Sequence, residues 1–272
     1  MERNSDNRPK PSALIMSTIA ITLFLSACGQ TPNSDLKIIG GAKVSANDPL
    51  ATRVSALVSN KNEIRCTVAA ISPSVFITAA HCVYGRNLEG WTIQSGITLD
   101  GETLPVASAT VHSEFSLPIL YSSLEPDHAP NDIAVIQTSE PTQGTIPVPI
   151  LRKRPGDQAE TSRNIIIAGF GRTDGASPES VGTLEQTTVV ITKFNKYAHE
   201  FTTQDADGKM GCHGDSGGPA FEKIGKTLTL IGTVSRGDNS CKSGTTVFTD
   251  LSEFGDFLST FAEEIDLDNQ KR

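Results

Sequence analysis

The sequence predicts an all-β protein, either a barrel or a sandwich. Its candidate strands are short, and Gly, Pro, Asn and Asp residues separate them at frequent intervals, which is typical of antiparallel β proteins. These strands do not alternate with long amphipathic helices, so a fold with helices covering a parallel sheet is not expected. Periodicity alone leaves the choice between barrel and sandwich open.

The candidate strands fall on either side of a Pro-rich, partly basic connection. This connection runs from Pro141 to Arg163 and is the predicted boundary between two parts of the body. The candidates are Val54–Val58, Ile64–Ile71, Val75–Ala79, Trp91–Ile97, Val106–His112, Ile133–Thr138, Asn164–Gly169, Leu184–Ile191, Gly218–Glu222, Leu228–Ser235 and Thr245–Thr249.

The C-terminal part has the spacing of an amphipathic helix. Phe254, Phe257, Leu258, Phe261 and Ile265 recur at intervals of about three or four residues, as on one face of a helix. We expect a helix over about residues 251–265, with these side chains packed against the body.

The first 28 residues are typical of an export signal. A basic start precedes an apolar stretch, 13–27, that is shorter than the ~20 residues of an ordinary membrane span. The stretch ends in Leu25-Ser26-Ala27-Cys28, which resembles a bacterial lipobox and implies that Cys28 is lipidated. An ordinary cleaved signal is the alternative, and export is expected either way. Gly29, where Asp would signal inner-membrane retention, favours the outer membrane, and the polar residues 29–37 are expected to form a tether.

Charge and motif content argue against several classes of function. The net charge is −8, whereas a nucleic-acid partner calls for a basic face. The sequence contains no HExxH, no CxxC and no phosphate-binding loop. We therefore expect no metal, no other cofactor and no nucleic acid, and we expect a monomer.

Three short motifs carry the residue types of nucleophilic catalysis. TAAHC at 78–82 contains His81, NDIAVI at 131–136 contains Asp132, and GDSGGP at 214–219 contains Ser216. The glycines around Ser216 permit unusual backbone angles. A serine hydroxyl needs a positioned base to become a nucleophile, and the near-neutral pKa of histidine suits that task. His112, His128 and His199 are expected to be ordinary surface or core residues.

In this order the motifs resemble those of the trypsin/chymotrypsin family of serine proteases. Ile38-Ile39-Gly40-Gly41 also resembles that family's mature N-terminus, and the resemblance runs to about Ile265. It implies an all-β fold of two six-stranded antiparallel β-barrels with a C-terminal α-helix. The expected protease domain covers 38–272, with barrel one at about 38–145 and barrel two at about 160–250.

The resemblance assigns a role to each motif. It implies a serine endopeptidase in which Ser216 attacks the substrate carbonyl and His81 carries the proton, while Asp132 fixes the tautomer of His81. The N–H groups of Gly214 and Ser216 are expected to form the oxyanion hole. The implied substrate is a protein or peptide.

The cysteines fit this reading. The chain has five, and an odd number in an exported protein calls for an explanation. Lipidation of Cys28 leaves four, which allow three pairings or, as the alternative, four free thiols. The resemblance selects the pairs Cys66–Cys82 and Cys212–Cys241.

The resemblance also implies activation by cleavage after Lys37. The new ammonium group of Ile38 would pair with Asp215 and order the oxyanion loop. The alternative is that Ile38 only begins a strand. If Cys28 carries a lipid, this cleavage would also release the enzyme from the membrane.

The primary specificity pocket departs from that of trypsin. Met210 lies six residues before Ser216, where an Asp would select Lys or Arg. A buried cation there would lack a counter-charge, so we expect cleavage after an apolar residue of small to medium size. Such an enzyme should cut poorly after Lys37, which implies a separate Lys/Arg-specific activating protease.

The pocket walls are expected to come from other segments. Ser235, Arg236 and Gly237 occupy the place of the family's Ser-Trp-Gly, and Gly237 leaves one wall open. Thr246 would narrow the pocket, and His213 would lie at its rim. Arg236 would either attract acidic groups farther along the substrate or remain solvated.

Other functions are possible for such a sequence. A relative used as a binding module or adhesin usually lacks a member of the triad, and none is missing here. A hydrolase acting only on esters would use the same three residues. An α/β-hydrolase is not expected, because the candidate strands do not alternate with helices.

Overall fold

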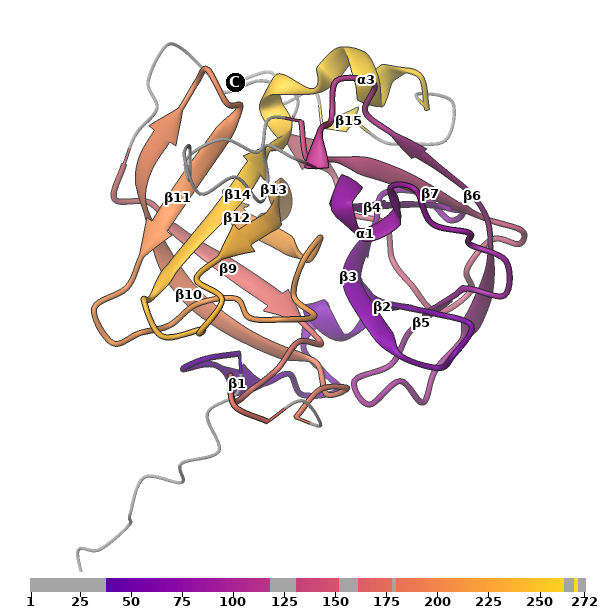
Figure 1. Ribbon diagram of the computed structural model, residues 1–272, viewed down its shortest axis with the longest axis horizontal. Helices are drawn as coiled ribbons and strands as arrows, with labels where there is room; N and C mark the ends of the chain where they lie inside the picture. Colours follow the sequence, from indigo (N-terminus) through magenta and orange to yellow (C-terminus); the bar gives the residue numbers. More distant parts are fainter. Residues whose placement is uncertain (1–37, 118–130, 152–160, 178–179, 262–266, 269–272) are drawn as a thin grey trace, which may run out of the picture. The chain divides into compact units, whose positions relative to one another are not determined.

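Two closed six-stranded antiparallel β-barrels form the body of the protein (Figure 1). The computed structural model describes residues 38–117, 131–151, 161–177, 180–261 and 267–268. The expected signal, lipidation site, tether and cleavage residue Lys37 lie outside these residues, as do His128 and Ile265. None of the helices in the described ranges has the length and apolar character needed to cross a membrane.

Barrel one contains the six strands expected before the connection. Its strands pair in the order β2-β3-β4-β7-β6-β5, and β2 and β4 are buried at every residue. Most boundaries differ from the predicted ones by only a few residues. The strands are β2 (Val54–Val58), β3 (Ile64–Ala70), β4 (Val75–Thr78), β5 (Thr92–Gln94), β6 (Thr103–Val111) and β7 (Ala134–Thr138).

Barrel two contains one strand that the sequence did not reveal. It pairs in the order β12-β9-β10-β11-β14-β13 and closes through β12 and β13. The unpredicted strand is β11, Glu-Phe-Thr-Thr-Gln, which lacks an obvious apolar alternation but pairs with β10 and β14. The strands are β9 (Asn164–Gly169), β10 (Glu185–Asn195), β11 (Glu200–Gln204), β12 (Pro219–Ile224), β13 (Thr227–Gly237) and β14 (Thr245–Asp250).

The start of the described chain associates with barrel two. Strand β1 (Ala42–Lys43) pairs with β10, and Ile38 is buried in an apolar cluster of barrel two. Only after the 3₁₀ turn η1 (Pro49–Thr52) does the chain enter barrel one. By strand pairing, barrel one therefore begins at Val54 and not near residue 38.

The C-terminal helix is shorter than predicted. Helix α3 covers Gly255–Ser259, after the 3₁₀ turn η2 (Leu251–Glu253). The prediction of a continuous helix from residue 251 is wrong. Asp250 caps η2 by accepting from the N–H of Ser252, and the backbone at Phe254 leaves helical geometry before α3 begins. The predicted packing holds, since Phe254 and Leu258 are buried.

The two barrels share one apolar cluster. Ile77 and Ile133 from barrel one belong to the same cluster as Phe170 and Phe221 from barrel two. The short strand β8 (Ile150–Leu151) pairs in parallel with β13 and with β15 (Leu267–Asp268). The short helix α1 (Ala80–Val83), which contains His81, follows β4 and lies on the side of barrel one that meets barrel two (Figure 1).

Candidate active site

His81 and Asp132 are held together by two hydrogen bonds. The main-chain N–H of His81 donates to Oδ1 of Asp132 at 2.9 Å, and Nδ1 of His81 lies 2.8 Å from Oδ2. Asp132 is fully buried. An ionised carboxylate only accepts hydrogen bonds, so Nδ1 carries a proton, and when the imidazole is neutral the lone pair is on Nε2.

Barrel two completes the surroundings of Asp132. The hydroxyl of Ser235 on β13 donates to Oδ2 of Asp132 at 2.7 Å, and the hydroxyl of Thr249 on β14 donates to its main-chain oxygen at 3.0 Å. Ser235, expected beside the substrate pocket, therefore also anchors the acid. Asp132 is a point where both barrels contribute to one hydrogen-bond network.

The charges of this pair favour ionisation of both groups. Burial alone would lower the pKa of His81, but the charge and hydrogen bond of Asp132 raise it above its ordinary value, and Arg86 opposes that rise. Burial would raise the pKa of Asp132, but His81 and the hydrogen bond from Ser235 bring it below its ordinary value. Asp132 is therefore an anion poised to stabilise an imidazolium.

The structure places the main chain of Ser216 beside the segment that carries His81. The carbonyl oxygen of Ser216 accepts a hydrogen bond from the N–H of Thr67 at 2.9 Å and lies 3.8 Å from Sγ of Cys82, the residue after His81. Gly217 has a φ of +75°, and a side chain there would collide with Thr78. The glycine is thus required for the turn that brings Ser216 to this position.

The Gly214 segment is oriented by contacts on both sides. The N–H of Arg172 donates to the carbonyl of His213 at 2.8 Å, so in this trans peptide the N–H of Gly214 points the opposite way. Among the described residues, neither this N–H nor that of Ser216 has a hydrogen-bond acceptor. Both remain available to an oxygen of a bound molecule.

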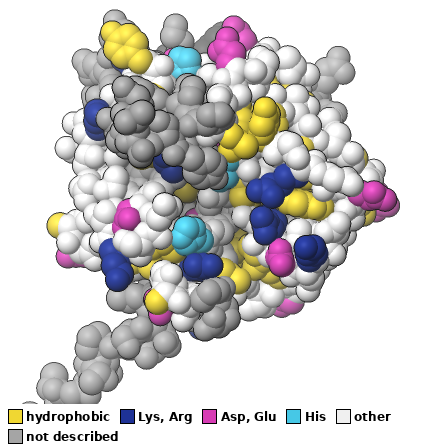
Figure 2. Space-filling model, viewed as in Figure 1, with side chains coloured by type: hydrophobic (Ala, Val, Ile, Leu, Met, Phe, Trp, Pro, Cys, Tyr) yellow, Lys and Arg dark blue, Asp and Glu magenta, His cyan; other side chains and the backbone are white. Residues whose placement is uncertain are grey.

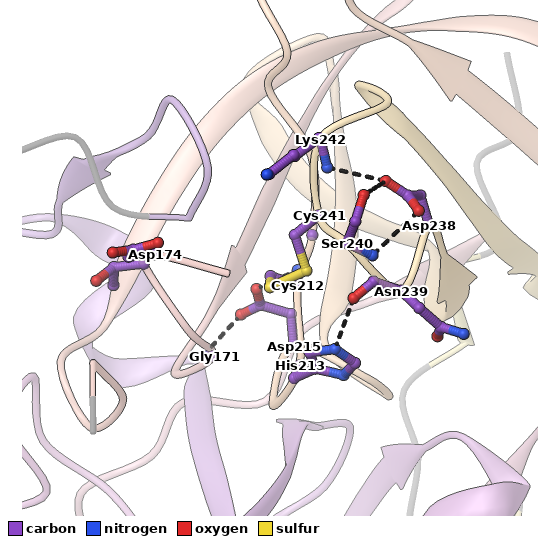
Figure 3. The surroundings of a disulfide bond; sticks show 12 residues. Gly171, Asp174, Cys212, His213, Asp215, Asp238, Asn239, Ser240, Cys241 and Lys242 are labelled. Carbon is purple, nitrogen blue, oxygen red and sulfur yellow. Dashed lines mark hydrogen bonds between the residues drawn. A yellow bond between two sulfur atoms is a disulfide. The ribbon is translucent and has the colours of Figure 1, made fainter. Parts of the chain in front are cut away.

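Both expected disulfides are present. Cys66 pairs with Cys82, which closes the loop carrying His81, and Cys212 pairs with Cys241 (Figure 3). Disulfides are typical of proteins exported to an oxidising compartment. Sulfur atoms of Cys66 and Cys82 lie near His81 in a group that resembles a metal site, but both are bonded to each other and offer no thiolate.

Asp215 is buried between two main-chain N–H groups. Gly171 donates to its Oδ1 and Cys212 to its Oδ2, both at 2.9 Å (Figure 3). Burial raises the pKa of Asp215 to about 6, although these two hydrogen bonds act to lower it. The Ile38 segment is near, because Ile39 pairs with Met210 in an isolated β-bridge.

Met210, the expected floor of the specificity pocket, is buried in the interior of the protein. Its side chain is fully buried, and a Cβ placed on Gly237 would lie 3.2 Å from its Cε. Thr246 is also buried, and its hydroxyl accepts from the N–H of Gly211 at 3.0 Å. Three of the predicted pocket residues, Met210, Gly237 and Thr246, therefore lie on adjacent segments, and Met210 extends toward Gly237.

The rim residues have partners that the sequence did not indicate. His213 is exposed, and its Nε2 lies 3.1 Å from the carbonyl of Asn239 (Figure 3). Arg236 is held by Glu200 on β11 through two hydrogen bonds of 2.5 and 3.0 Å. The charge of Arg236 is thus paired with that of Glu200. Arg236 is therefore neither solvated nor unpaired and able to attract acidic groups of a substrate, which were the two expectations for it.

The loop beside His213 is organised by a single carboxylate. Asp238 accepts hydrogen bonds from the N–H groups of Ser240, Lys242 and Ser243 and from the hydroxyl of Ser240. These donors lower the pKa of Asp238 to about 2.

In the space-filling view, histidine side chains lie near the middle of the face shown, with Lys and Arg side chains nearby (Figure 2).

Comparisons with known proteins give one consistent family. Residues 38–258 match the family model described as Trypsin. Human transmembrane protease serine 5 is 26% identical over 90% of this chain, and the chain spans 55%, about half, of that protein's length. The venom peptide isomerase heavy chain of Agelenopsis aperta is 26% identical over 71% of this chain and 86% of its own length.

A solved structure shares the fold. Neuropsin, described as a serine protease expressed in the limbic system of mouse brain, superposes with a TM-score of 0.66 and 18% sequence identity. The match covers 82% of this chain and 99% of the neuropsin chain.

Proposed function

The chain belongs to the trypsin family, and we propose that it is an exported serine endopeptidase that uses Ser216, His81 and Asp132. One observation carries the proposal: Asp132 holds His81 at two atoms, and the Ser216 main chain lies against the disulfide next to His81. The family membership and the fold support peptide hydrolysis as the reaction.

The proposed reaction follows the triad mechanism. Oγ of Ser216 attacks the peptide carbonyl while its proton passes to Nε2 of His81. The carbonyl oxygen becomes an oxyanion that accepts hydrogen bonds from the N–H groups of Gly214 and Ser216. His81 then gives the proton to the leaving amine, and an acyl ester remains on Ser216.

Water completes the cycle. His81 takes a proton from water as its oxygen attacks the ester, and then returns that proton to Oγ of Ser216 as the acid product leaves. His81 must be neutral at each attack. The pKa of His81 is above its ordinary value. As the pH is lowered, activity should therefore begin to fall at a higher pH than it would if the histidine had its ordinary pKa.

We further propose an apolar residue of small to medium size on the amino side of the cleaved bond. Met210 is buried and reaches to within contact of the Gly237 wall. Its thioether offers no counter-charge to a Lys or Arg side chain. A peptide-library cleavage profile tests this, and a preference for Lys or Arg would contradict it.

Activation by cleavage after Lys37 is part of the same proposal. The buried Asp215 has a raised pKa and accepts only from main-chain N–H groups among the described residues, so a nearby ammonium group would stabilise its ionised form. Ile38 is buried within the same barrel. We propose that a separate Lys/Arg-specific protease makes this cut, and a purified chain that processes itself at Lys37 would contradict that.

Membrane attachment through a lipid on Cys28 extends the proposal to location. Cleavage after Lys37 would then release soluble enzyme that begins at Ile38. Fractionation should show the uncut chain in membranes and the cut chain in the soluble fraction. Active enzyme that still carries lipid would contradict release.

Labelling with a fluorophosphonate probe tests the central claim. The chain cut after Lys37 should form a covalent adduct, and Ser216→Ala should abolish it. Absence of labelling in a folded, cut chain would favour the non-catalytic binding module instead. Labelling with turnover of esters but of no peptide would favour the ester-specific alternative.

A further inference from the structure

Thr67 on β3 joins barrel one to the loop that carries Gly214 and Ser216. It is fully buried, and its main-chain N–H donates to the carbonyl of Ser216 at 2.9 Å. Its own carbonyl accepts from the hydroxyl of Thr78 on β4 at 3.1 Å. The main chain at Thr67 is therefore fixed by neighbours on both sides of the site.

The side chain of Thr67 makes two further contacts in the same direction. Its hydroxyl donates to the carbonyl of Gly214 at 2.9 Å and accepts from the N–H of Phe170 at 3.1 Å. A hydroxyl has one proton to donate, so these two contacts fix which way it points. One buried oxygen thus connects barrel one to two separate segments of barrel two.

These two segments also bind each other. Gly171, next to Phe170, donates to Asp215, and Arg172 donates to the carbonyl of His213. The peptide before Gly214 is thus held through Arg172, and the peptide after it is held through Thr67. Gly214 itself has a φ of +101°, a backbone conformation that favours glycine. Because glycine has no side chain to restrict its backbone angles, the hydrogen bonds of its neighbours must hold it in place.

We propose that Thr67 is a positioning residue: by holding the carbonyl of Gly214, in the peptide after it, Thr67 restricts rotation of the backbone at Gly214 and so keeps the Gly214 N–H, in the peptide before it, directed at the developing oxyanion. The inference rests on the proposed function, since it concerns the donors of that reaction. Oxyanion donors act by being oriented before charge develops. The hydroxyl of Thr67 would therefore affect the chemical step more than the binding of substrate.

Three substitutions separate the hydroxyl from the packing of Thr67. Thr67→Val keeps the branched shape and removes the hydroxyl, whereas Thr67→Ser keeps the hydroxyl and removes the methyl group. Thr229→Val is the matched control, because Thr229 is a fully buried threonine of β13 whose hydroxyl has no hydrogen-bond partner among the described residues. All are made in the full chain and cut after Lys37 with the same lysine-specific endopeptidase.

We expect Thr67→Val to lower kcat for a peptide substrate about 10-fold, less than the loss of a whole oxyanion donor, with KM changed by less than about 2-fold. Inhibition by a peptide aldehyde, whose adduct places an oxygen in the oxyanion hole, should weaken by a factor similar to the loss in kcat/KM. Thr67→Ser should recover most of the activity, and Thr229→Val should resemble the wild-type enzyme.

The outcomes are distinct. If the wild-type chain labels with fluorophosphonate and the Thr67→Val variant has an unchanged kcat, this inference is overturned and the proposed function is not. The same holds if the Thr67→Ser variant is as impaired as Thr67→Val, which would indicate packing. A folded wild-type chain that neither labels nor cleaves overturns the proposed function and this inference together. If Thr67→Val does not fold, Thr67→Ala compared with Thr67→Ser isolates the same oxygen.

Discussion

The two halves of the candidate site are held in different ways. Asp132 and His81 are joined by two hydrogen bonds, and Ser235 and Thr249 from the other barrel fix the acid. Asp215, one residue before Ser216, is also buried but accepts from main-chain N–H groups of Gly171 and Cys212. Its pKa is raised, whereas the pKa of Asp132 is lowered.

This difference indicates where control of activity is possible. Folding alone supplies a cationic partner, His81, for Asp132. The carboxylate of Asp215 pays a desolvation penalty that a charge arriving later could offset. In the proposed mechanism, the base His81 and the acid Asp132 are thus already paired in the folded chain, while the segment of the proposed nucleophile and oxyanion donors contains a buried carboxylate on which activation could act.

The largest expected effect comes from breaking the first half. Asp132→Asn should leave the fold intact, but the amide can direct an N–H at Nδ1 of His81 where the carboxylate offers an acceptor. The proton of His81 would then be on Nε2, the wrong tautomer for a base, so kcat should fall by about 10⁴. Steady-state kinetics on a peptide substrate measures this. Circular dichroism of the variant serves as the control, and a loss of less than about 10-fold would contradict the role of Asp132.

Substitution of Asp215, in the half of the site that carries Ser216, should lower activity by preventing activation. In the chain cut after Lys37, Asp215→Asn removes the proposed partner of the Ile38 ammonium and should lower kcat by about 10² to 10³, the range for loss of an oxyanion donor. Asp207→Asn, at a carboxylate with 84% side-chain exposure, is the matched control. Equal activity of the two variants would show that Asp215 has no part in activation.

Stability of the uncut chain should depend on pH through the same residue. The folded pKa of about 6 exceeds the ordinary value of 3.8, so the folded state binds the extra proton between these values. Stability should therefore fall as pH rises from about 4 to about 6, by up to about 3 kcal/mol. Urea unfolding of the uncut wild-type chain and of Asp215→Asn measures it, and identical pH profiles would refute the assignment.

The smallest expected effect concerns the pocket. Met210→Ala should shift the preferred residue toward larger apolar side chains by about 10-fold in relative kcat/KM, because it removes atoms that face the Gly237 wall. Met210→Leu conserves volume and should change the profile little. A peptide library compares them, and an unchanged profile for Met210→Ala would show that Met210 does not limit pocket depth.

Local patterns were sufficient for some features and not for others. Barrel one was predicted strand by strand because its strands are rich in apolar β-formers such as those of Val75–Thr78. Strand β11 was missed because Thr202 and Thr203 show no alternation, and its pairing with β10 and β14 comes from distant segments. The helix was overestimated because side-chain spacing does not reveal the cap at Asp250.

The site shows the same division. The disulfide pairs followed from the family resemblance, and both were found. The pairing of Arg236 with Glu200 and the contacts of Thr67 could not be read from the sequence. The partner of Arg236 lies 36 positions away along the chain, and the partners of the Thr67 hydroxyl lie more than 100 positions away.

By itself the sequence determined the all-β class, the motifs around His81, Asp132 and Ser216, and the residue types available for chemistry, because each depends on neighbours along the chain. The tertiary structure alone decided which groups satisfy the buried polar atoms: Ser235 for Asp132, Glu200 for Arg236 and Thr67 for Gly214. A buried donor or acceptor must find a partner wherever folding brings one within reach. That requirement acts across space and leaves little trace in local sequence.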